Sequence, residues 1–213
     1  MKKYELTAEF IEKWGKKLFR IKALISFGSV EAGELGGYVE KEDNLAQNGN
    51  AWVYGDAEVY GNARVSGNAR VSGDAEVSGN ARVSGNAEVS GNAWVYGDAW
   101  VYGNARVYGD AEVSGDARVY GDAEVSGNAD YLLIGRIGSR FSFTTFFKNK
   151  DKGITVSCGC FLGTIAEFRA KVTDTHGNNK HAKIYNLAAD MAELQILGEE
   201  HFDKLNTNKS EPF

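Results

Sequence analysis

The chain has 213 residues, with 29 acidic residues against 24 Lys and Arg and a formal net charge of −5 at pH 7. This balance argues against a protein that binds nucleic acid or anionic membranes through a basic surface. The apolar runs are only a few residues long and the N-terminus lacks the apolar core of a secretory signal, so we expect no membrane span and a cytoplasmic location.

Residues 1–36 are not repetitive and are expected to form an N-terminal cap. Thr7 is placed to begin a short helix that has Trp14 on its apolar face and stops at Gly15. Apolar residues then alternate over 19–27, which predicts a strand. We expect this segment to cover the apolar end of the repeats that follow it.

From Gly49 onward the sequence repeats every six residues as Gly-(Asn/Asp)-Ala-x-Val-(Ser/Tyr), and a weaker form of the register extends over 37–138. Ala-x-Val is extended, with Ala and Val pointing inward and x pointing outward. Gly and Asn or Asp then turn a corner. A helix is excluded because a Gly in every hexad would cost about 1 kcal/mol each relative to Ala. The pattern predicts a solenoid.

The hexad Val53-Tyr54-Gly55-Asp56-Ala57-Glu58 and its neighbours resemble the hexapeptide-repeat family. The resemblance implies a left-handed parallel β-helix with a triangular section, three hexads per turn and, commonly, a homotrimeric assembly. We therefore predict an all-β solenoid of five to six turns, with the N-terminal cap and a small C-terminal α+β domain.

If three hexads make a turn, the outward residues form three columns of residues 18 apart. One column alternates in charge: Trp52, Arg70, Glu88, Arg106 and Glu124. The second is acidic and the third is basic: Glu58, Glu76, Trp94, Glu112 and Asp130, then Arg64, Arg82, Trp100 and Arg118. Like charges stacked in one column repel each other, so each of these two columns predicts an oppositely charged partner surface.

A parallel threefold assembly supplies that partner, because it brings one face of each protomer against a different face of the next. The predicted interface pairs are Glu58–Arg64, Glu76–Arg82, Trp94–Trp100 and Glu112–Arg118. The rival interpretation is a solvated prism with incidental charge stripes, since exposed ion pairs contribute little.

After the repeats, residues 139–205 predict a small α+β head. A β-hairpin spans 141–157, a capping box at Thr164 and Glu167 begins a first helix, and a second helix covers about 179–197. The polar tail 206–213 is expected to be disordered.

Candidate binding residues lie where the repeats meet the head. Arg136, Ser139, Arg140, Thr144 and Thr145 combine guanidinium and hydroxyl groups that could hold a phosphate or carboxylate, although a structural junction that ends the coil is the favoured interpretation.

Two cysteines lie in the head, and we expect free thiols there and no metal site. Cys158 and Cys160 are too close together for a disulfide framework, and Cys-x-Cys with His176 and His181 lacks the spacing of structural zinc.

The family resemblance also implies an alternative function. Acyltransferases of the hexapeptide superfamily use a coil or loop histidine with acetyl-coenzyme A, but the only histidines here are His176, His181 and His201, outside the repeats. We therefore assign no catalytic residue and no cofactor, and keep the acyltransferase as the alternative.

The repeat followed by this head also resembles uncharacterised proteins of bacteriophages and gut bacteria. We expect a noncatalytic homotrimer that presents its heads and intersubunit grooves to a ligand or host partner. As a phage accessory protein, it would sequester a small anionic nucleotide signal or block a host defence protein.

Overall fold

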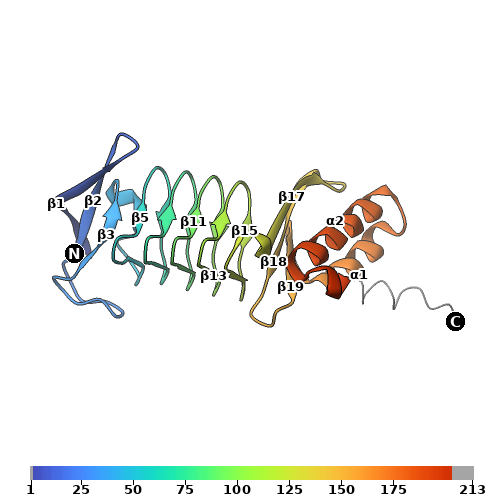
Figure 1. Cartoon of the computed structure of the whole chain (residues 1–213). Helices are drawn as coiled ribbons and strands as arrows, with labels where there is room; N and C mark the ends of the chain where they lie inside the picture. Colours follow the sequence, from blue (N-terminus) through green and yellow to red (C-terminus); the bar gives the residue numbers. More distant parts are fainter. Residues whose placement is uncertain (1, 203–213) are drawn as a thin grey trace. The chain divides into compact units, whose positions relative to one another are not determined.

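The structure is a computed structural model that describes residues 2–202 (Figure 1). The chain divides into two compact units, Met1–Asn128 and Ala129–Phe213, each with a hydrophobic core of its own. Among the described residues, neither helix is both long and apolar enough to cross a membrane.

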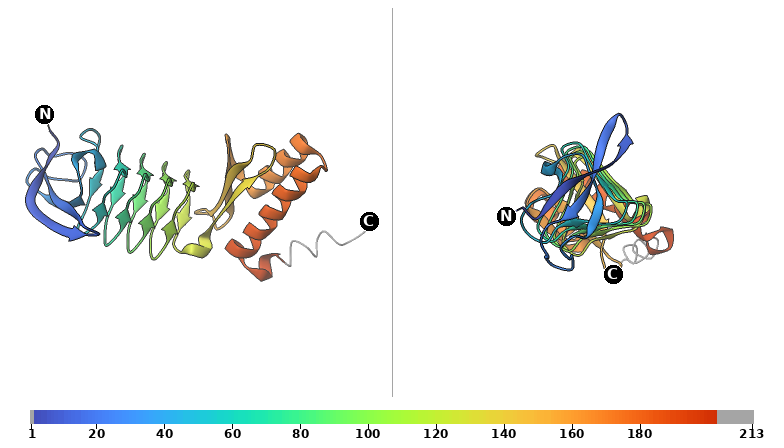
Figure 2. Two further views of the ribbon diagram at one scale, coloured as in Figure 1. Left: turned by 90° about the horizontal axis from the view of Figure 1, so that it is seen from above. Right: turned by 90° about the vertical axis from the view of Figure 1, so that its left-hand side faces the viewer.

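The first unit contains a β-solenoid in which each hexad contributes a two-residue strand and a corner. Strands 18 residues apart pair in parallel, so Glu58 aligns with Glu76, and Arg64 aligns with Arg82. Three hexads therefore make one coil, and the array winds about five turns. Seen end-on, the coils overlay in a triangular outline (Figure 2). The predicted parallel β-solenoid is confirmed.

The solenoid has three faces, named here by the charges of their outward residues. The acidic face consists of β3 (Leu35–Val39), β5 (Glu58–Val59), β8 (Glu76–Val77), β11 (Trp94–Val95) and β14 (Glu112–Val113). The basic face consists of β6 (Arg64–Val65), β9 (Arg82–Val83), β12 (Trp100–Val101) and β15 (Arg118–Val119). The mixed face consists of β4 (Trp52–Val53), β7 (Arg70–Val71), β10 (Glu88–Val89), β13 (Arg106–Val107) and β16 (Glu124–Val125).

The interior of the coils is a stack of small apolar side chains, as the repeat predicts. Every repeat Ala and Val between positions 51 and 125 is completely buried. At one corner, side-chain amides form a ladder with donor–acceptor distances of 3.0–3.1 Å, through Asn50, Asn68, Asn86, Asn104 and Asp122. The Asp122 carboxylate accepts from the amide below it but cannot donate, so the ladder ends on it.

The segment predicted to be a helix near Thr7 is one strand of a β-hairpin instead. β1 (Tyr4–Lys13) and β2 (Lys16–Ala23) pair antiparallel, and both residues of the turn between them, Trp14 and Gly15, have positive φ. A two-residue turn of this kind matches the twist of paired strands, so Gly15 closes a hairpin rather than a helix. The strand expected over 19–27 therefore begins earlier and ends at residue 23.

Thr7 has a different role from the one predicted. Its hydroxyl accepts a hydrogen bond from the backbone N–H of Glu9 at 3.2 Å, within an irregularity of β1 between Leu6 and Phe10. Beyond the hairpin, β2 pairs with β3, so the hairpin extends the sheet of the acidic face past the first coil.

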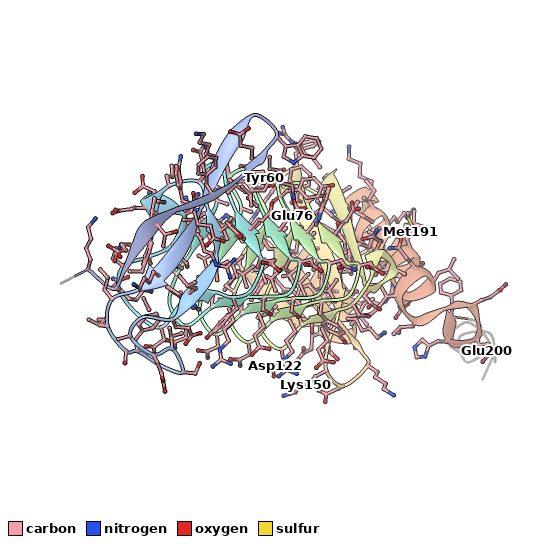
Figure 3. All side chains as sticks on the ribbon, turned by 60° about the vertical axis from the view of Figure 1, so that its left-hand side comes forward. Tyr60, Glu76, Asp122, Lys150, Met191 and Glu200 are labelled. Carbon is pink, nitrogen blue, oxygen red and sulfur yellow. The ribbon has the colours of Figure 1, made fainter. Side chains whose placement is uncertain are left out.

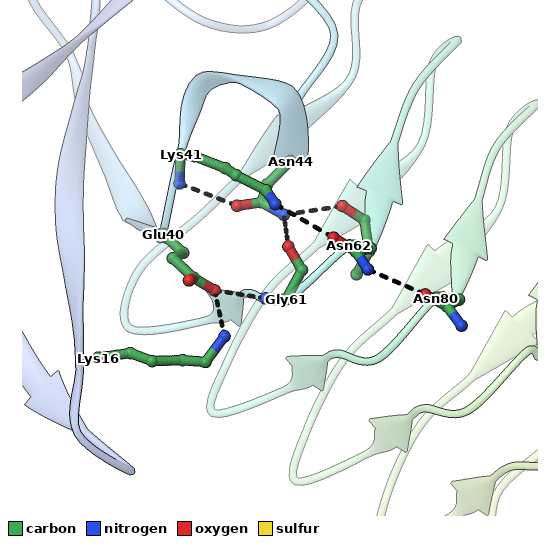
Figure 4. Close-up of polar contacts among 8 residues, drawn as sticks. Lys16, Glu40, Lys41, Asn44, Gly61, Asn62 and Asn80 are labelled. Carbon is green, nitrogen blue, oxygen red and sulfur yellow. Dashed lines mark hydrogen bonds and ion pairs between the residues drawn. The ribbon is translucent and has the colours of Figure 1, made fainter.

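Polar side chains satisfy backbone groups that the first coil leaves without a preceding coil. Lys3 Nζ donates to the carbonyl of Ala51 at 2.9 Å. Asn44, at the end of the short 3-10 helix η1 (Glu42–Asn44), donates to the carbonyl of Ala63 at 2.8 Å (Figure 4). These contacts replace the ladder hydrogen bonds of a missing coil, so the edge is not left open to another strand.

The sequence places Trp52 outward on the mixed face, and the structure buries it completely. Tyr4 and Phe27 pack edge-on against the indole, with ring centroids 6.1 and 5.4 Å away. The first coil has no coil beneath it, and the N-terminal segment folds over its tryptophan. The outward position that the repeat predicts for Trp52 therefore does not expose it to solvent.

The coils end at β16, earlier than the repeat register predicts. Residues 131–137, which the register counts as repeats, form β17 (Tyr131–Ile137) and pair antiparallel with β18 (Ser142–Lys148). Asp130 lies in the 3-10 helix η2 (Asn128–Asp130) and binds Lys148 Nζ at 2.9 Å, so it does not continue the acidic column. The corner residues Gly-Asn-Ala stop at 129, and the apolar run after them favours one long strand.

The second unit is an antiparallel sheet with two helices, which confirms the predicted α+β class, but the sheet has four strands where the sequence predicts one hairpin. Its strand order is β17, β18, β19 (Ile154–Cys158) and β20 (Phe161–Thr164), followed by α1 (Ile165–His176) and α2 (Lys180–Leu197). The predicted capping box is present, because the Thr164 hydroxyl accepts from the N–H of Glu167 and the Glu167 carboxylate accepts from that of Thr164. The tail 206–213 lies outside the described residues.

Candidate functional site

The residues predicted to form a subunit interface lie on two neighbouring faces of the solenoid. Glu58, Glu76, Trp94 and Glu112 point outward from the acidic face, and Arg64, Arg82, Trp100 and Arg118 point outward from the basic face. The mixed face alternates in charge, and Arg106 lies 3.5 Å from Glu88 within it. The acidic and basic faces are therefore the ones with single-sign columns.

The first two carboxylates of the acidic face are bound by a lysine of the same chain. Lys13 Nζ lies 2.7 Å from Glu58 Oε2 and 2.6 Å from Glu76 Oε1. Tyr60 donates to the other Glu76 oxygen at 3.0 Å, and Figure 3 labels this pair near the β1–β2 hairpin. Burial alone lowers the pKa of Lys13, but hydrogen bonds and charge attraction from the two carboxylates raise it above its usual value.

This ion pair reduces the exposed negative charge that the acidic face presents to a partner. The side chains of Glu58 and Glu76 are only 14% and 12% exposed. The sequence predicts a helix over residues 7–14, and a helix would not place Lys13 against the carboxylates of the acidic face. The contact of Lys13 with Glu58 and Glu76 was therefore not predicted. The signal that could have found it is the dipeptide Trp14-Gly15 between two extended, alternating segments.

The acidic face is open further along the solenoid. Trp94 is 41% exposed, and the ring of Tyr96 packs edge-on against it at a centroid distance of 6.4 Å. The Tyr96 hydroxyl donates to Glu112 at 3.4 Å, and this carboxylate is exposed. An indole, a phenol and a carboxylate thus stand together at solvent.

On the basic face, Trp100 separates two guanidinium groups. Those of Arg82 and Arg118 lie 5.0 and 5.4 Å from its ring centroid, one on the coil before it and one on the coil after it. Each such cation–π contact contributes about 0.5–1 kcal/mol at an exposed site. Beside this stack, Tyr102 and Tyr120 lie parallel, with centroids 4.5 Å apart. The indole thus separates the charges of Arg82 and Arg118 within the column.

A groove of about 530 Å³ runs beside the first coils of the basic face. Arg64, Arg82, Trp100 and Tyr102 line it, together with the segment 42–47. Among the described residues, neither Arg64 nor Arg82 has an ion-pair partner. The groove therefore combines two arginines and two carboxylates, those of Glu42 and Asp43, with an exposed aromatic wall.

The tip of the β1–β2 hairpin presents a third exposed indole, after Trp94 and Trp100. Trp14 is 75% exposed and has φ of +52°, a left-handed conformation that costs roughly 1–2 kcal/mol for a residue other than Gly. Close to the tip, Phe10 is 41% exposed and Lys17 Nζ lies 4.1 Å from its ring centroid. A large apolar side chain held at solvent in a costly conformation points to a contact surface.

The structure divides the predicted anion-binding residues into separate groups. Thr144 and Thr145 are buried in β18, and Thr144 donates to Cys158 Sγ at 3.2 Å. The Arg136 guanidinium lies 5.9 Å from the ring centroid of Phe143. Of the five predicted residues, Ser139 and Arg140 line the same cavity.

That cavity, of about 200 Å³, belongs to the second unit and is named here the head cavity. It is lined by Ser139, Arg140, Ser142, Cys158, Gly159, Cys160, Phe161, Phe168, Lys171, Val172, Thr175, His176 and Tyr185. The thiol of Cys158 has the hydroxyls of Thr144 and Tyr185 beside it, and burial together with Cys158 raises the pKa of Tyr185 to about 12. Neither hydroxyl is a base at neutral pH, so the thiol has no activating partner in them.

Cys158 and Cys160 are both free thiols, as predicted. Within residues 2–202, no group of three or more His, Cys, Asp or Glu side chains is arranged to hold a metal ion. His176 instead stacks on Tyr185 with ring centroids 5.8 Å apart.

Comparison with known families supports the solenoid alone. A family model described as the YdcK beta solenoid repeat matches residues 57–73, 63–78, 87–103 and 99–115, all within the coils. The chain is thus a β-solenoid repeat protein, similar to that family over these coils. No curated protein gives a significant match. The resemblance to hexapeptide-repeat and phage proteins stays a prediction.

Proposed function

We propose that this β-solenoid is a noncatalytic homotrimeric scaffold that presents its C-terminal units and intersubunit grooves to a ligand or partner. The observation that carries the proposal is the pair of exposed indoles, Trp94 and Trp100. They lie one hexad apart on neighbouring faces, each within a single-sign column. A parallel threefold assembly brings these two faces together and buries both rings at one level.

The Lys13 contact changes the predicted pairing at the lower levels. Because Lys13 occupies Glu58 and Glu76, those carboxylates are not the partners of Arg64 and Arg82 in this assembly. The hairpin stands over the acidic face at that level, so it takes the place of the carboxylates between two protomers.

The groove on the basic face fits this hairpin in position and chemistry. Its walls include Arg64 and Arg82, which belong to the same two coils as the carboxylates that bind Lys13. Parallel threefold packing preserves height along the solenoid, so the projecting Trp14 of one chain meets the groove of the next. Glu12, exposed and without an ion pair among the described residues, offers a charge for either arginine.

The assembly is tested by light scattering on the purified chain. We expect three chain masses for the wild type and dissociation for Arg118→Glu, because the reversal sets like charges opposite each other three times per trimer. Arg70→Glu on the mixed face is the matched control and leaves the trimer intact. Glu112→Arg added to Arg118→Glu restores it. A monomeric wild type overturns the proposal.

The hairpin contact is tested separately. Trp14→Ala removes the indole from the tip, and we expect a clear increase in the concentration at which trimers dissociate. Phe141→Ala is the matched control, since Phe141 is likewise an exposed aromatic residue with positive φ, but in the second unit. If both variants dissociate at the wild-type concentration, the hairpin does not lie between protomers.

The groove also favours a second function, the sequestration of a small nucleotide by a phage accessory protein. Arg64 and Arg82 could bind phosphate while Trp100 and Tyr102 stack on a base. Thermal shift with ATP and with cyclic dinucleotides tests it, with Arg64→Ala expected to abolish any shift. If the hairpin of a neighbour fills the groove, Trp14→Ala increases the shift.

The acyltransferase remains the alternative within the superfamily that the sequence resembles. It requires a base beside a groove, and the three histidines of the chain all lie after the coils, at 176, 181 and 201. Binding of acetyl-coenzyme A, measured by calorimetry, distinguishes it from the scaffold. The blocking of a host defence protein rests on the family resemblance alone.

A further inference from the structure

We propose that the head cavity is a binding site for a small organic anion that consists of an apolar body and one phosphate or carboxylate group. The inference concerns the second unit alone and does not depend on the trimer.

The charge of the cavity wall is the first argument. The chain carries a net charge of −5, yet no Asp or Glu is among the residues that line this cavity, and Arg140 and Lys171 are. Lys171 Nζ forms an ion pair with Asp174 Oδ2 at 3.0 Å. Arg140 has no ion-pair partner among the described residues. A guanidinium without a counterion, at a wall without carboxylates, selects for an anion.

The position of Arg140 is the second argument. A Cβ atom built on Gly159 would lie 3.8 Å from Arg140 Nη1, which places the guanidinium over the turn that joins β19 and β20. Ser139, Ser142 and Thr175 add hydroxyl groups to the same cavity. These groups can both donate and accept, so they can complete the coordination of an oxyanion held by the guanidinium.

The apolar part of the cavity is the third argument. Phe161, Phe168 and Val172 line it, and the two phenylalanine rings pack with centroids 5.7 Å apart. Phe168 and Val172 belong to the core of the second unit, so this wall is held in place. Sites that combine a mostly apolar lining with a few placed polar groups are typical of small-molecule binding. A volume of about 200 Å³ accommodates a single substituted ring or a short branched chain.

Calorimetry on the full chain tests the site with phenyl phosphate and benzoate as probes, and with inorganic phosphate and benzyl alcohol as comparisons. We expect at least one of the two aromatic anions to bind at least tenfold more tightly than inorganic phosphate or benzyl alcohol, because only the anions use both the guanidinium and the apolar wall. Which of the two binds more tightly tells a phosphate ligand from a carboxylate ligand. Binding of neither aromatic anion overturns the proposal.

Variants of two arginines in the same unit localise the binding. Arg140→Gln should weaken the binding of the aromatic anion at least tenfold. The guanidinium of Arg136 lies against Phe143 outside the cavity, so Arg136→Gln should bind the same anion as the wild type does. Equal affinity of Arg140→Gln and the wild type overturns the proposal.

A measurement on the unaltered chain keeps the test independent of folding defects in the variants. Cys160 is exposed and lines the cavity, and Cys158 is the only other thiol. Saturating phenyl phosphate or benzoate should slow the alkylation of Cys160 by iodoacetamide several-fold, as followed by mass spectrometry. An unchanged rate in the presence of both probes contradicts binding at this cavity.

Discussion

Lys13 Nζ lies 2.6 Å from Glu76 Oε1, although 63 residues separate the two in the sequence. The same ammonium also contacts Glu58, one coil earlier. One lysine of the hairpin thus binds two stacked carboxylates that would otherwise repel each other. The ion pairs of Lys13 and the pairing of β2 with β3 both hold the hairpin on the acidic face.

Replacing this lysine should loosen the hairpin. We expect Lys13→Met to lower the free energy of unfolding of the cap by about 2 kcal/mol, less than the roughly 3–5 kcal/mol of a fully buried pair, because the lysine side chain is 25% exposed. Hydrogen exchange of β1 and β2, read by mass spectrometry, measures the change. Lys17→Met is the control, since Lys17 only covers the ring of Phe10. Equal exchange in both variants contradicts the expectation.

The solenoid could be predicted because the residues of each hexad determine the local structure of that hexad. Ala and Val fix the inward direction, and Gly fixes the corner, so the register of Glu58 on Glu76 follows from counting. Local sequence patterns also predicted both helices of the second unit, the first through the capping box at Thr164; the structure adds an N-cap at Asn179 for the second.

The cap and the head cavity could not be predicted in this way, because both depend on contacts between distant segments. Residues 7–13 lie in the strand β1, which pairs with β2, and β2 in turn pairs with β3 of the acidic face. Arg140 and Lys171 line one cavity because the sheet and α1 pack together. The sequence predicts repeats beyond Ala129 because Tyr131 and Ile137 keep the six-residue spacing of the apolar positions. The corner residues of the repeat are absent there.

The corner glycines provide a test of close coil stacking. Gly85 and Gly121 have nearly the same φ, +71° and +70°. A Cβ on Gly85 would lie 2.9 Å from the backbone nitrogen of Gly103, whereas one on Gly121 meets nothing within 4 Å. Alanine at either position costs about 1–2 kcal/mol for the left-handed backbone. We expect Gly85→Ala to cost about 1–3 kcal/mol more, because it also forces two coils apart.

Urea unfolding followed by circular dichroism compares the two glycine variants. The midpoint of Gly121→Ala should fall modestly and that of Gly85→Ala much further. If the two midpoints coincide, the coils have enough freedom to admit a methyl group, and the close approach is not a constraint.

Lys3 predicts a pH dependence of stability. Its side chain is buried, and burial lowers its pKa from 10.5 to about 8. Between these two values the unfolded chain binds more protons at this lysine than the folded chain does. The free energy of unfolding therefore rises with pH from about 8 toward 10, and the charged lysine costs stability below that window.

The contribution of Lys3 is isolated by comparison with Lys3→Met. We expect the stability of the wild type relative to this variant to increase between about pH 8 and 10, as measured by urea unfolding. Tyr4, whose pKa is raised by burial and by Glu42, acts in the opposite direction at higher pH, but it is present in both proteins. Parallel pH profiles would show that Lys3 titrates normally in the fold.

Trp52 and Trp94 occupy equivalent outward positions of the repeat but have opposite surroundings, which makes them a matched pair. Trp52 is completely buried against Tyr4 and Phe27, while Trp94 is 41% exposed. We expect Trp52→Ala to cost about 3–5 kcal/mol, because it opens a cavity between the cap and the first coil. Trp94→Ala should change the stability of a single chain by no more than about 0.5 kcal/mol and act instead on assembly. Hydrogen exchange of β1 and β2 separates the two, since only the first variant should release those strands. Equal protection of the cap in both variants would mean that the buried indole does not hold the cap on the solenoid.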